Sequence, residues 1–132
     1  MTELPDSRSV EDAEPAKLQI RVQNMQGPAV VRLTGEIDLS NVDRLQDQLS
    51  LLVEQGHVVI DLSEVSFIDS TGLTAFIVAH RRATAADTRL HLAGATGTVQ
   101  RLLELTQLDR HLHHHVTLAT ALEAASAHLE AD

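Results

Sequence analysis

The sequence predicts a single α/β domain, in which a mixed sheet of four to five strands has about four helices packed on it. Short apolar segments typical of strands alternate along the chain with longer segments whose apolar residues recur at helical spacing. The segment 58–62 is apolar almost throughout, as in a strand that is covered on both faces. The 132 residues include no cysteine, but a chain of this length buries a sizeable core without disulfides or structural metal.

The chain begins with an acidic segment and a predicted β-hairpin. Residues 1–16 carry five acidic residues against one arginine, together with two prolines, and we expect them to form a disordered acidic tail. From Lys17 to Gln23 polar and apolar residues alternate, which predicts a strand with one buried face. Turn residues at 24–28 lead into a second strand at 30–33. The domain itself is expected to span residues 17–129.

A first helix is predicted after the segment 35–39. Apolar residues recur at helical spacing over residues 42–53. Ser40, with Asp43 three positions later, resembles a capping box that would start this helix. Gly56 is expected to end it in the left-handed conformation.

The central strand and the segment after it form the most informative stretch of the chain. The strand 57–62 is predicted to end at Ser63-Glu64, and a short apolar segment at 65–68 leads into Asp69-Ser70-Thr71-Gly72. These small polar residues predict a sharp turn that holds a hydroxyl at the rim of the fold. Ser70 next to an aspartate, just before an apolar-periodic run, is typical of a helix N-cap.

The remaining predicted elements are shorter. Residues 89–93 favour a strand, residues 96–105 a helix and residues 108–115 a polar connection. Residues 116–118 are a candidate for a short strand. A capping box at 120–123 predicts a last helix, which completes a β β α β α β α β α order.

Composition and charge exclude several classes of function. The net charge is −9 and the cations are Lys17 and nine scattered arginines, which argues against binding to nucleic acid. No apolar run approaches the roughly 18 residues that a membrane span requires. The chain also lacks the apolar core of a secretion signal, so we expect a cytoplasmic protein without membrane insertion.

Catalytic, cofactor and metal chemistry find little support in the residues. A hydrolase nucleophile elbow around Ser70 would need a glycine where Ile68 stands, so we predict no catalytic residue and no enzymatic activity. The turn 94–97 lacks the full glycine pattern of a nucleotide site, and no cofactor is expected. Nearly contiguous histidines point in different directions on an extended loop, so a specific metal site is not expected, although weak adventitious binding remains open. These histidines are His111, His113, His114 and His115.

Two carboxylates and one hydroxyl remain as candidates for function. Asp38 and Asp61 each follow apolar strand residues, where carboxylates often face a ligand crevice. For Asp61 we favour a structural bond to the turn through Ser63, and for Asp38 the question stays open. Ser70 at a helix N-terminus is suited to accept a phosphoryl group, which would add a charge of about −1.5 to −2 beside Asp69 and switch the binding of a partner without refolding.

Three segments resemble one known family. Residues 58–73, VVIDLSEVSFIDSTGL, resemble the signature of STAS domains in the branch of bacterial anti-sigma factor antagonists. Gly35-Glu36-Ile37-Asp38 resembles the Gly-x-x-Asp segment of that family, and residues 90–108 resemble its closing strand and helix. The resemblance covers roughly residues 17–129.

The resemblance implies a partner switch. An unphosphorylated antagonist of this family binds an anti-sigma factor that is also a Ser/Thr kinase of the histidine-kinase-like ATPase fold, and so frees a sigma factor. The kinase inactivates the antagonist by phosphorylating the serine of the motif, and a PP2C-type phosphatase restores it. By position Ser70 matches the phosphoacceptor, with Thr71 as second choice. The residues expected to contact the partner are Asp38, Ser40, Asp69, Ser70, Thr71, Gly72 and Thr74.

Two other functions are compatible with the same fold. One is an accessory STAS subunit of an ABC-type lipid transport complex, in which the same surface would bind an ATPase. The other is a STAS sensor that binds a small molecule at the turn 94–97. Neither the acidic tail nor the length of the chain separates these alternatives from the antagonist.

Overall fold

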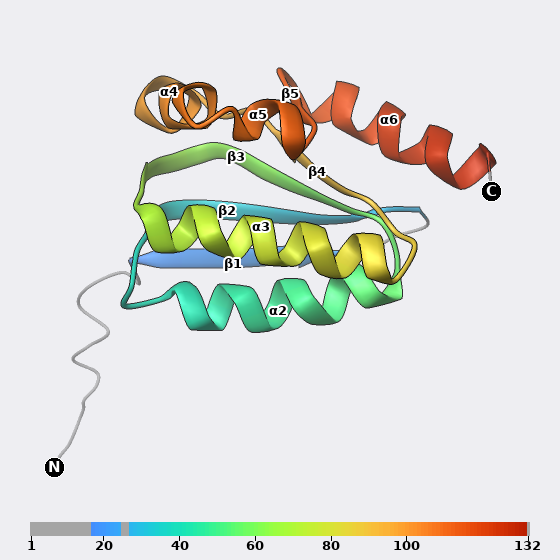
Figure 1. Ribbon diagram of the computed structural model, residues 1–132, viewed down its shortest axis with the longest axis horizontal. Helices are drawn as coiled ribbons and strands as arrows, with labels where there is room; N and C mark the ends of the chain where they lie inside the picture. Colours follow the sequence, from blue (N-terminus) through green and yellow to red (C-terminus); the bar gives the residue numbers. More distant parts are fainter. Residues whose placement is uncertain (1–16, 25–26, 132) are drawn as a thin grey trace, which may run out of the picture.

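A computed structural model describes residues 17–24 and 27–131 (Figure 1). The predicted acidic tail, residues 1–16, lies outside the described residues. The described part of the chain contains one five-stranded sheet and five helices. No helix among the described residues is both long enough and apolar enough to cross a bilayer.

The sheet is mixed, as predicted, and its strands follow the order β1-β2-β3-β4-β5. β1 and β2 form the predicted antiparallel hairpin, whereas the pairs β2–β3, β3–β4 and β4–β5 are parallel. Parallel neighbours need a crossover connection, and the helices supply it. The strands are β1 (Leu18–Gln23), β2 (Ala29–Ile37), β3 (Val58–Ile68), β4 (Leu90–Ala93) and β5 (His114–His115).

The helices pack on both faces of the sheet. Figure 1 shows α2 and α3 side by side, and α6 away from them beyond β4. The described residues contain one helix more than the predicted four, because the expected polar connection 108–115 includes the single turn α5. The helices are α2 (Val42–Gln55), α3 (Ser70–Ala85), α4 (Gly97–Leu105), α5 (Leu108–His111) and α6 (Leu118–Ala131).

Two separate apolar clusters hold the helices to the sheet. The larger one joins α2, α3 and α4 to the strands and includes the fully buried Phe76. The smaller one joins α6 to β3 and β4 through four residues, Val59, Ala93, Ala121 and Ala125. Because successive side chains of a strand point to opposite faces, Ile60 contributes to the first cluster and its neighbour Val59 to the second.

The expected break at Ser63-Glu64 was wrong, because β3 continues to Ile68. β2 is long enough to pair with the whole of β3, and Thr34 stands opposite Glu64. The register between the two strands shifts twice, between Arg32 and Thr34 and between Gly35 and Glu36. Such irregularities accommodate the polar residues without ending the strand.

The capping box expected at Ser40 and Asp43 was also wrong. The N-cap of α2 is Asn41, which makes no side-chain capping bond, and the Ser40 hydroxyl donates to Asp38 instead. At the other end of α2, Gly56 has φ 169°, which is extended and not left-handed.

The C-terminal elements begin earlier than predicted. The last strand is His114–His115, whereas Val116, in the expected strand 116–118, is 83% exposed. α6 begins at Leu118, and the Thr117 hydroxyl accepts a hydrogen bond from the Thr120 N–H at 3.1 Å. Thr117 therefore takes the capping role that the sequence pattern assigned to Thr120.

Gly35 fixes how β1 begins. It has φ +112°, and a Cβ there would lie 2.1 Å from the backbone oxygen of Lys17. That oxygen accepts a hydrogen bond from the Glu36 N–H at 2.9 Å. The close approach of the two backbones thus depends on the missing side chain.

We expect Gly35→Ala to destabilise the protein far more than Gly27→Ala. Gly27 also has a positive φ of +105°, but a Cβ there would meet nothing within 4 Å. This control therefore measures only the cost of placing an alanine at a positive φ. The difference in the free energy of unfolding should be at least about 2 kcal/mol, because the backbone of β1 must move. Urea unfolding of the two variants measures it, and equal values would contradict the importance of the Lys17 contact.

Candidate functional site

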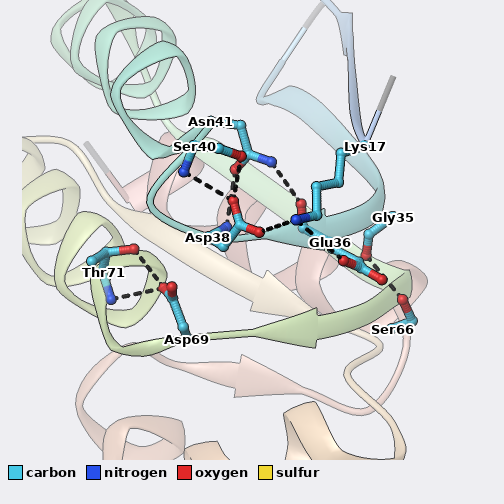
Figure 2. A network of polar contacts seen from close by, with 9 residues as sticks. All are labelled: Lys17, Gly35, Glu36, Asp38, Ser40, Asn41, Ser66, Asp69 and Thr71. Atoms are coloured by element: carbon cyan, nitrogen blue, oxygen red, sulfur yellow. Dashed lines mark hydrogen bonds and ion pairs between the residues drawn. The ribbon is translucent and has the colours of Figure 1, made fainter. Parts of the chain in front are cut away.

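Two strand ends bring the candidate residues together. β2 and β3 run parallel, and their last residues, Ile37 and Ile68, are paired. The Asp69 N–H donates to the Ile37 oxygen at 3.1 Å, so Asp38 and Asp69 leave the sheet side by side (Figure 2). The carboxyl ends of parallel strands are where open α/β sheets carry their sites. We call the surface formed by residues 36–41 and 69–74 the rim.

Asp69, and not Ser70, is the N-cap of α3. Its Oδ1 accepts hydrogen bonds from the N–H groups of Thr71 at 2.9 Å and Gly72 at 3.2 Å. The hydroxyl of Thr71 donates to the same oxygen at 2.5 Å. This hydroxyl is the main reason that the pKa of Asp69 is lowered, with backbone N–H groups, including that of Leu39, adding to the effect.

The two neighbouring hydroxyls differ in availability. Ser70 is the first residue of α3 and is exposed, and its hydroxyl makes no hydrogen bond within the described part of the chain. The Thr71 hydroxyl is half-buried and committed to Asp69. One turn further, the hydroxyl of the exposed Thr74 donates to the backbone oxygen of Ser70 at 3.0 Å and leaves the Ser70 hydroxyl untouched. The hydroxyl open to a reagent at this helix start is therefore that of Ser70.

Gly72 lets the helix start lie directly on the two strand ends. A Cβ at this position would lie 2.6 Å from Cγ1 of Ile68 and 2.8 Å from Cγ2 of Ile37. Both isoleucines belong to the larger core. The glycine is thus needed for close packing, which accounts for its place in the motif without a chemical role.

The turn between β2 and α2 is held by its own side chains. Oδ1 of Asp38 accepts from the Ser40 N–H at 3.0 Å and from the Ser40 hydroxyl at 2.6 Å. Asn41, which is 8% exposed, accepts from the Asp38 N–H and donates to the Glu36 oxygen at 2.9 Å. Leu39, at the tip of the turn, is 74% exposed. Sequence reasoning missed Asn41, because nothing in the local pattern indicates that an asparagine here is buried.

Lys17, which directly precedes β1, adds a cation to the rim. Its Nζ lies 2.5 Å from Oδ2 of Asp38 and 3.8 Å from Oε1 of Glu36 (Figure 2). The hydrogen bond from Lys17, followed by that from Ser40, lowers the pKa of Asp38 to about 2. The same contact with Asp38 raises the pKa of Lys17. Sequence reasoning missed this residue, since Lys17 reaches the site only through the pairing of β1 with β2.

The rim combines an exposed hydroxyl with excess negative charge. The ammonium group of Lys17 contacts two of the three carboxylates, Glu36 and Asp38, whereas the third, Asp69, is bound by Thr71 and Gly72 (Figure 2). A lowered pKa makes Asp38 and Asp69 weak proton acceptors at neutral pH. Neither carboxylate is therefore suited to activate the exposed Ser70 hydroxyl as a nucleophile.

Asp61 lies away from the rim, inside β3 and not at its end. Its Oδ1 accepts from the Ser63 N–H at 3.0 Å, which confirms the predicted structural bond. Its other oxygen lies 3.7 Å from the Arg32 guanidinium.

The histidines near the C-terminus lie around the end of β4. His115 Nε2 is 3.1 Å from Nδ1 of the buried His91, and the ring of His113 lies between those of His91 and His80, with centroid distances of 5.7 and 6.1 Å. His114 accepts from the Ala95 N–H at 3.1 Å. Burial is the first cause of the lowered pKa of His80, His114 and His115. Among the described residues no group of three or more side chains is arranged to hold a metal ion.

Comparisons with known proteins agree on one family. The family model described as the STAS domain matches residues 19–121. The anti-sigma-B factor antagonist of Staphylococcus aureus is 31% identical over 85 residues, which cover 63% of this chain and 79% of that protein.

Solved structures of this family share the fold. An anti-sigma factor antagonist from Mycobacterium paratuberculosis has a TM-score of 0.77 at 27% identity, and the match covers 86% of this chain and 97% of that chain. SpoIIAA in its unphosphorylated form has a TM-score of 0.71 at 20% identity, over 83% of this chain and 97% of that chain.

We expect Asp69→Ala to destabilise α3 through the loss of its N-cap. The melting temperature should fall by on the order of 5 °C, because the Thr71 N–H loses its acceptor and the Gly72 N–H keeps only the backbone oxygen of residue 69. The matched control is Asp43→Ala, which removes an exposed aspartate from the first turn of α2 without removing a cap. Thermal unfolding followed by circular dichroism measures both, and an equal fall in the control would contradict the capping role.

Proposed function

The chain belongs to the STAS domain family, and on this premise we propose that it is an anti-sigma factor antagonist that phosphorylation of Ser70 switches off. The relatives that support this are regulatory proteins, named as antagonists of anti-sigma factors. The observation that carries the proposal is the exposed Ser70 hydroxyl at the start of α3, which follows Asp69 directly and makes no hydrogen bond in the described part of the chain.

The partner would be an anti-sigma factor that is also a Ser/Thr kinase with the histidine-kinase-like ATPase fold. Binding of the unphosphorylated rim would release the sigma factor that the kinase holds, and a PP2C-type phosphatase would reverse the modification. The whole exchange would take place in the cytoplasm, where transcription occurs. The residues proposed to contact the kinase are Asp38, Ser40, Asp69, Ser70, Thr71, Gly72 and Thr74.

The modification itself is a phosphoryl transfer. The Ser70 oxygen forms a bond to the γ-phosphorus of ATP on the kinase, the bond from that phosphorus to ADP breaks, and the hydroxyl proton passes to a base of the kinase. The antagonist supplies only the hydroxyl and its position. It is thus a substrate of the kinase and not itself an enzyme.

Charge is the proposed basis of the switch. A phosphoryl group on Ser70 adds about −1.5 to −2 next to Asp69 and close to Asp38. The dipole of α3 favours an anion at this end, but the N–H groups of Thr71 and Gly72 already bind Asp69. The phosphate would therefore stay at the surface, tolerated by its own domain and repelled by a partner that fits the unmodified rim.

Incubation with a cognate anti-sigma kinase and ATP should add one phosphoryl group, and Ser70→Ala should abolish the addition. The expected result follows from the open Ser70 hydroxyl, and intact-mass spectrometry measures it. Thr71→Ala should still accept one group, although more slowly, because it loses a bond to Asp69. Full phosphorylation of Ser70→Ala together with none of Thr71→Ala would move the site to Thr71.

A carboxylate at the same position should weaken binding to the kinase. We expect Ser70→Glu to lose at least tenfold in affinity, about 1.4 kcal/mol, in isothermal titration calorimetry. Thr98→Glu adds the same charge at an exposed position of α4 and should bind like the wild type. Equal affinity of Ser70→Glu and wild type would contradict the electrostatic switch. Recovery of ABC-type transporter subunits in place of a kinase in a pull-down would favour the lipid-transport alternative.

A further inference from the structure

We propose that Lys17 is a positioning residue for the rim: its ammonium group holds Asp38, and through the end of β2, which is hydrogen-bonded to Asp69, it sets the start of α3 that carries Ser70. The contacts that link Lys17 to α3 do not depend on any assigned function. The effect expected on phosphorylation of Ser70 rests on the function proposed above.

The backbone of Lys17 is fixed before its side chain reaches the rim. Its oxygen accepts from the Glu36 N–H at 2.9 Å, at the point where Gly35 lets the two strands approach. From this anchor the side chain extends across the end of β2 to Asp38 (Figure 2). The ammonium group therefore has a defined position, although the side chain is about half exposed.

Asp38 uses its two oxygens for two different elements. Oδ2 binds Lys17 of the segment before β1, and Oδ1 binds the N–H and hydroxyl of Ser40 in the turn. Without the ammonium group, Oδ2 would lie close to the carboxylate of Glu36 with no cation between them. Arg44, the neighbouring cation on α2, is already committed to the Leu18 oxygen at 2.8 Å. Lys17 is thus the group that allows a charged Asp38 to stay in this conformation.

The end of β2 transmits this position to α3. Ile37 precedes Asp38, and its backbone oxygen accepts a hydrogen bond from the Asp69 N–H at 3.1 Å. Asp69 in turn caps α3 by accepting from Thr71 and Gly72, the two residues after Ser70. A continuous series of contacts therefore runs from Lys17 to both sides of the phosphoacceptor.

Nuclear magnetic resonance of the full chain tests the link without a kinase. In Lys17→Met the pKa of Asp38 should rise from about 2 toward its ordinary value of 3.8, and the backbone amide signals of Leu39, Thr71 and Gly72 should shift. Lys17→Arg should largely restore both properties. Arg101→Met removes the same charge from an exposed position of α4 and should change neither.

Two results would overturn the proposal. One is an Asp38 carboxyl that titrates at the same pH in Lys17→Met and wild type. The other is a raised pKa of Asp38 while the amide signals of Thr71 and Gly72 stay in place, since Lys17 would then act on Asp38 alone. Because Lys17 is the only lysine in the sequence, ¹⁵N-lysine labelling gives a single side-chain ammonium signal, which should report the ion pair directly in the wild type.

Kinetics with an anti-sigma kinase test the consequence for Ser70. For Lys17→Met we expect kcat/KM of phosphorylation to fall by about threefold to tenfold, because the hydroxyl is less well positioned. Lys17→Arg and Arg101→Met should retain the wild-type rate within about twofold. Shifted amides with an unchanged rate would overturn the role at Ser70. If the amides shift and the wild type itself is not phosphorylated, the positioning role stands and the proposed function fails.

Discussion

The parallel pairing of β2 with β3 along nearly their whole length determines where both the core and the rim lie. On one face the alternate residues of these strands meet α2 and α3 in the larger apolar cluster. At their carboxyl ends the same pairing sets Asp38 beside Asp69. A slip of one residue would turn the core residues to the other face and separate the two carboxylates. Stability and the candidate site therefore depend on the same register.

At the start of α3, the distribution of hydrogen bonds decides which hydroxyl is accessible. Asp69 satisfies two of the backbone N–H groups that every helix leaves unpaired, and it also binds the Thr71 hydroxyl. The Ser70 side chain is left outside this arrangement and faces solvent. A serine that capped the helix itself, as its sequence position suggests, would have its oxygen occupied. Because Asp69 is the cap, the Ser70 oxygen is not used to stabilise the helix.

Periodicity in the sequence predicted most of the fold, and local polar patterns predicted it less well. The hairpin, the crossover helices and the long buried strand follow from apolar spacing, which reflects burial directly. The capping box at Ser40 failed because Asp38 offers a better partner and Asn41 binds a backbone oxygen of β2. The break at Ser63-Glu64 failed because β2 continues to supply pairing partners. The true structure at both positions depends on contacts with another element of the fold, and the residues around each position give no indication of such contacts.

In the candidate site, too, the contiguous residues were predicted from the sequence and the residue contributed by another element was not. The motif containing Asp69, Ser70 and Gly72 is contiguous and was identified from the sequence. Lys17 reaches the rim only because Gly35 brings β1 close to β2, and a single lysine before a strand carries no signal of this.

α6 is attached to the sheet by a small cluster, in which two alanines and the partly buried Leu118 and Leu122 pack against Val59 and Ala93, whereas the rim lies above the larger core. The small cluster buries less apolar area than the larger core, so the C-terminal helix contributes less to the total free energy of folding than its length suggests. Proteins open first where few apolar contacts resist, and α6 is expected to detach and return while the rest remains folded. Such local opening would expose β4 at the end of the molecule remote from Ser70. The rim would then keep its shape through these fluctuations.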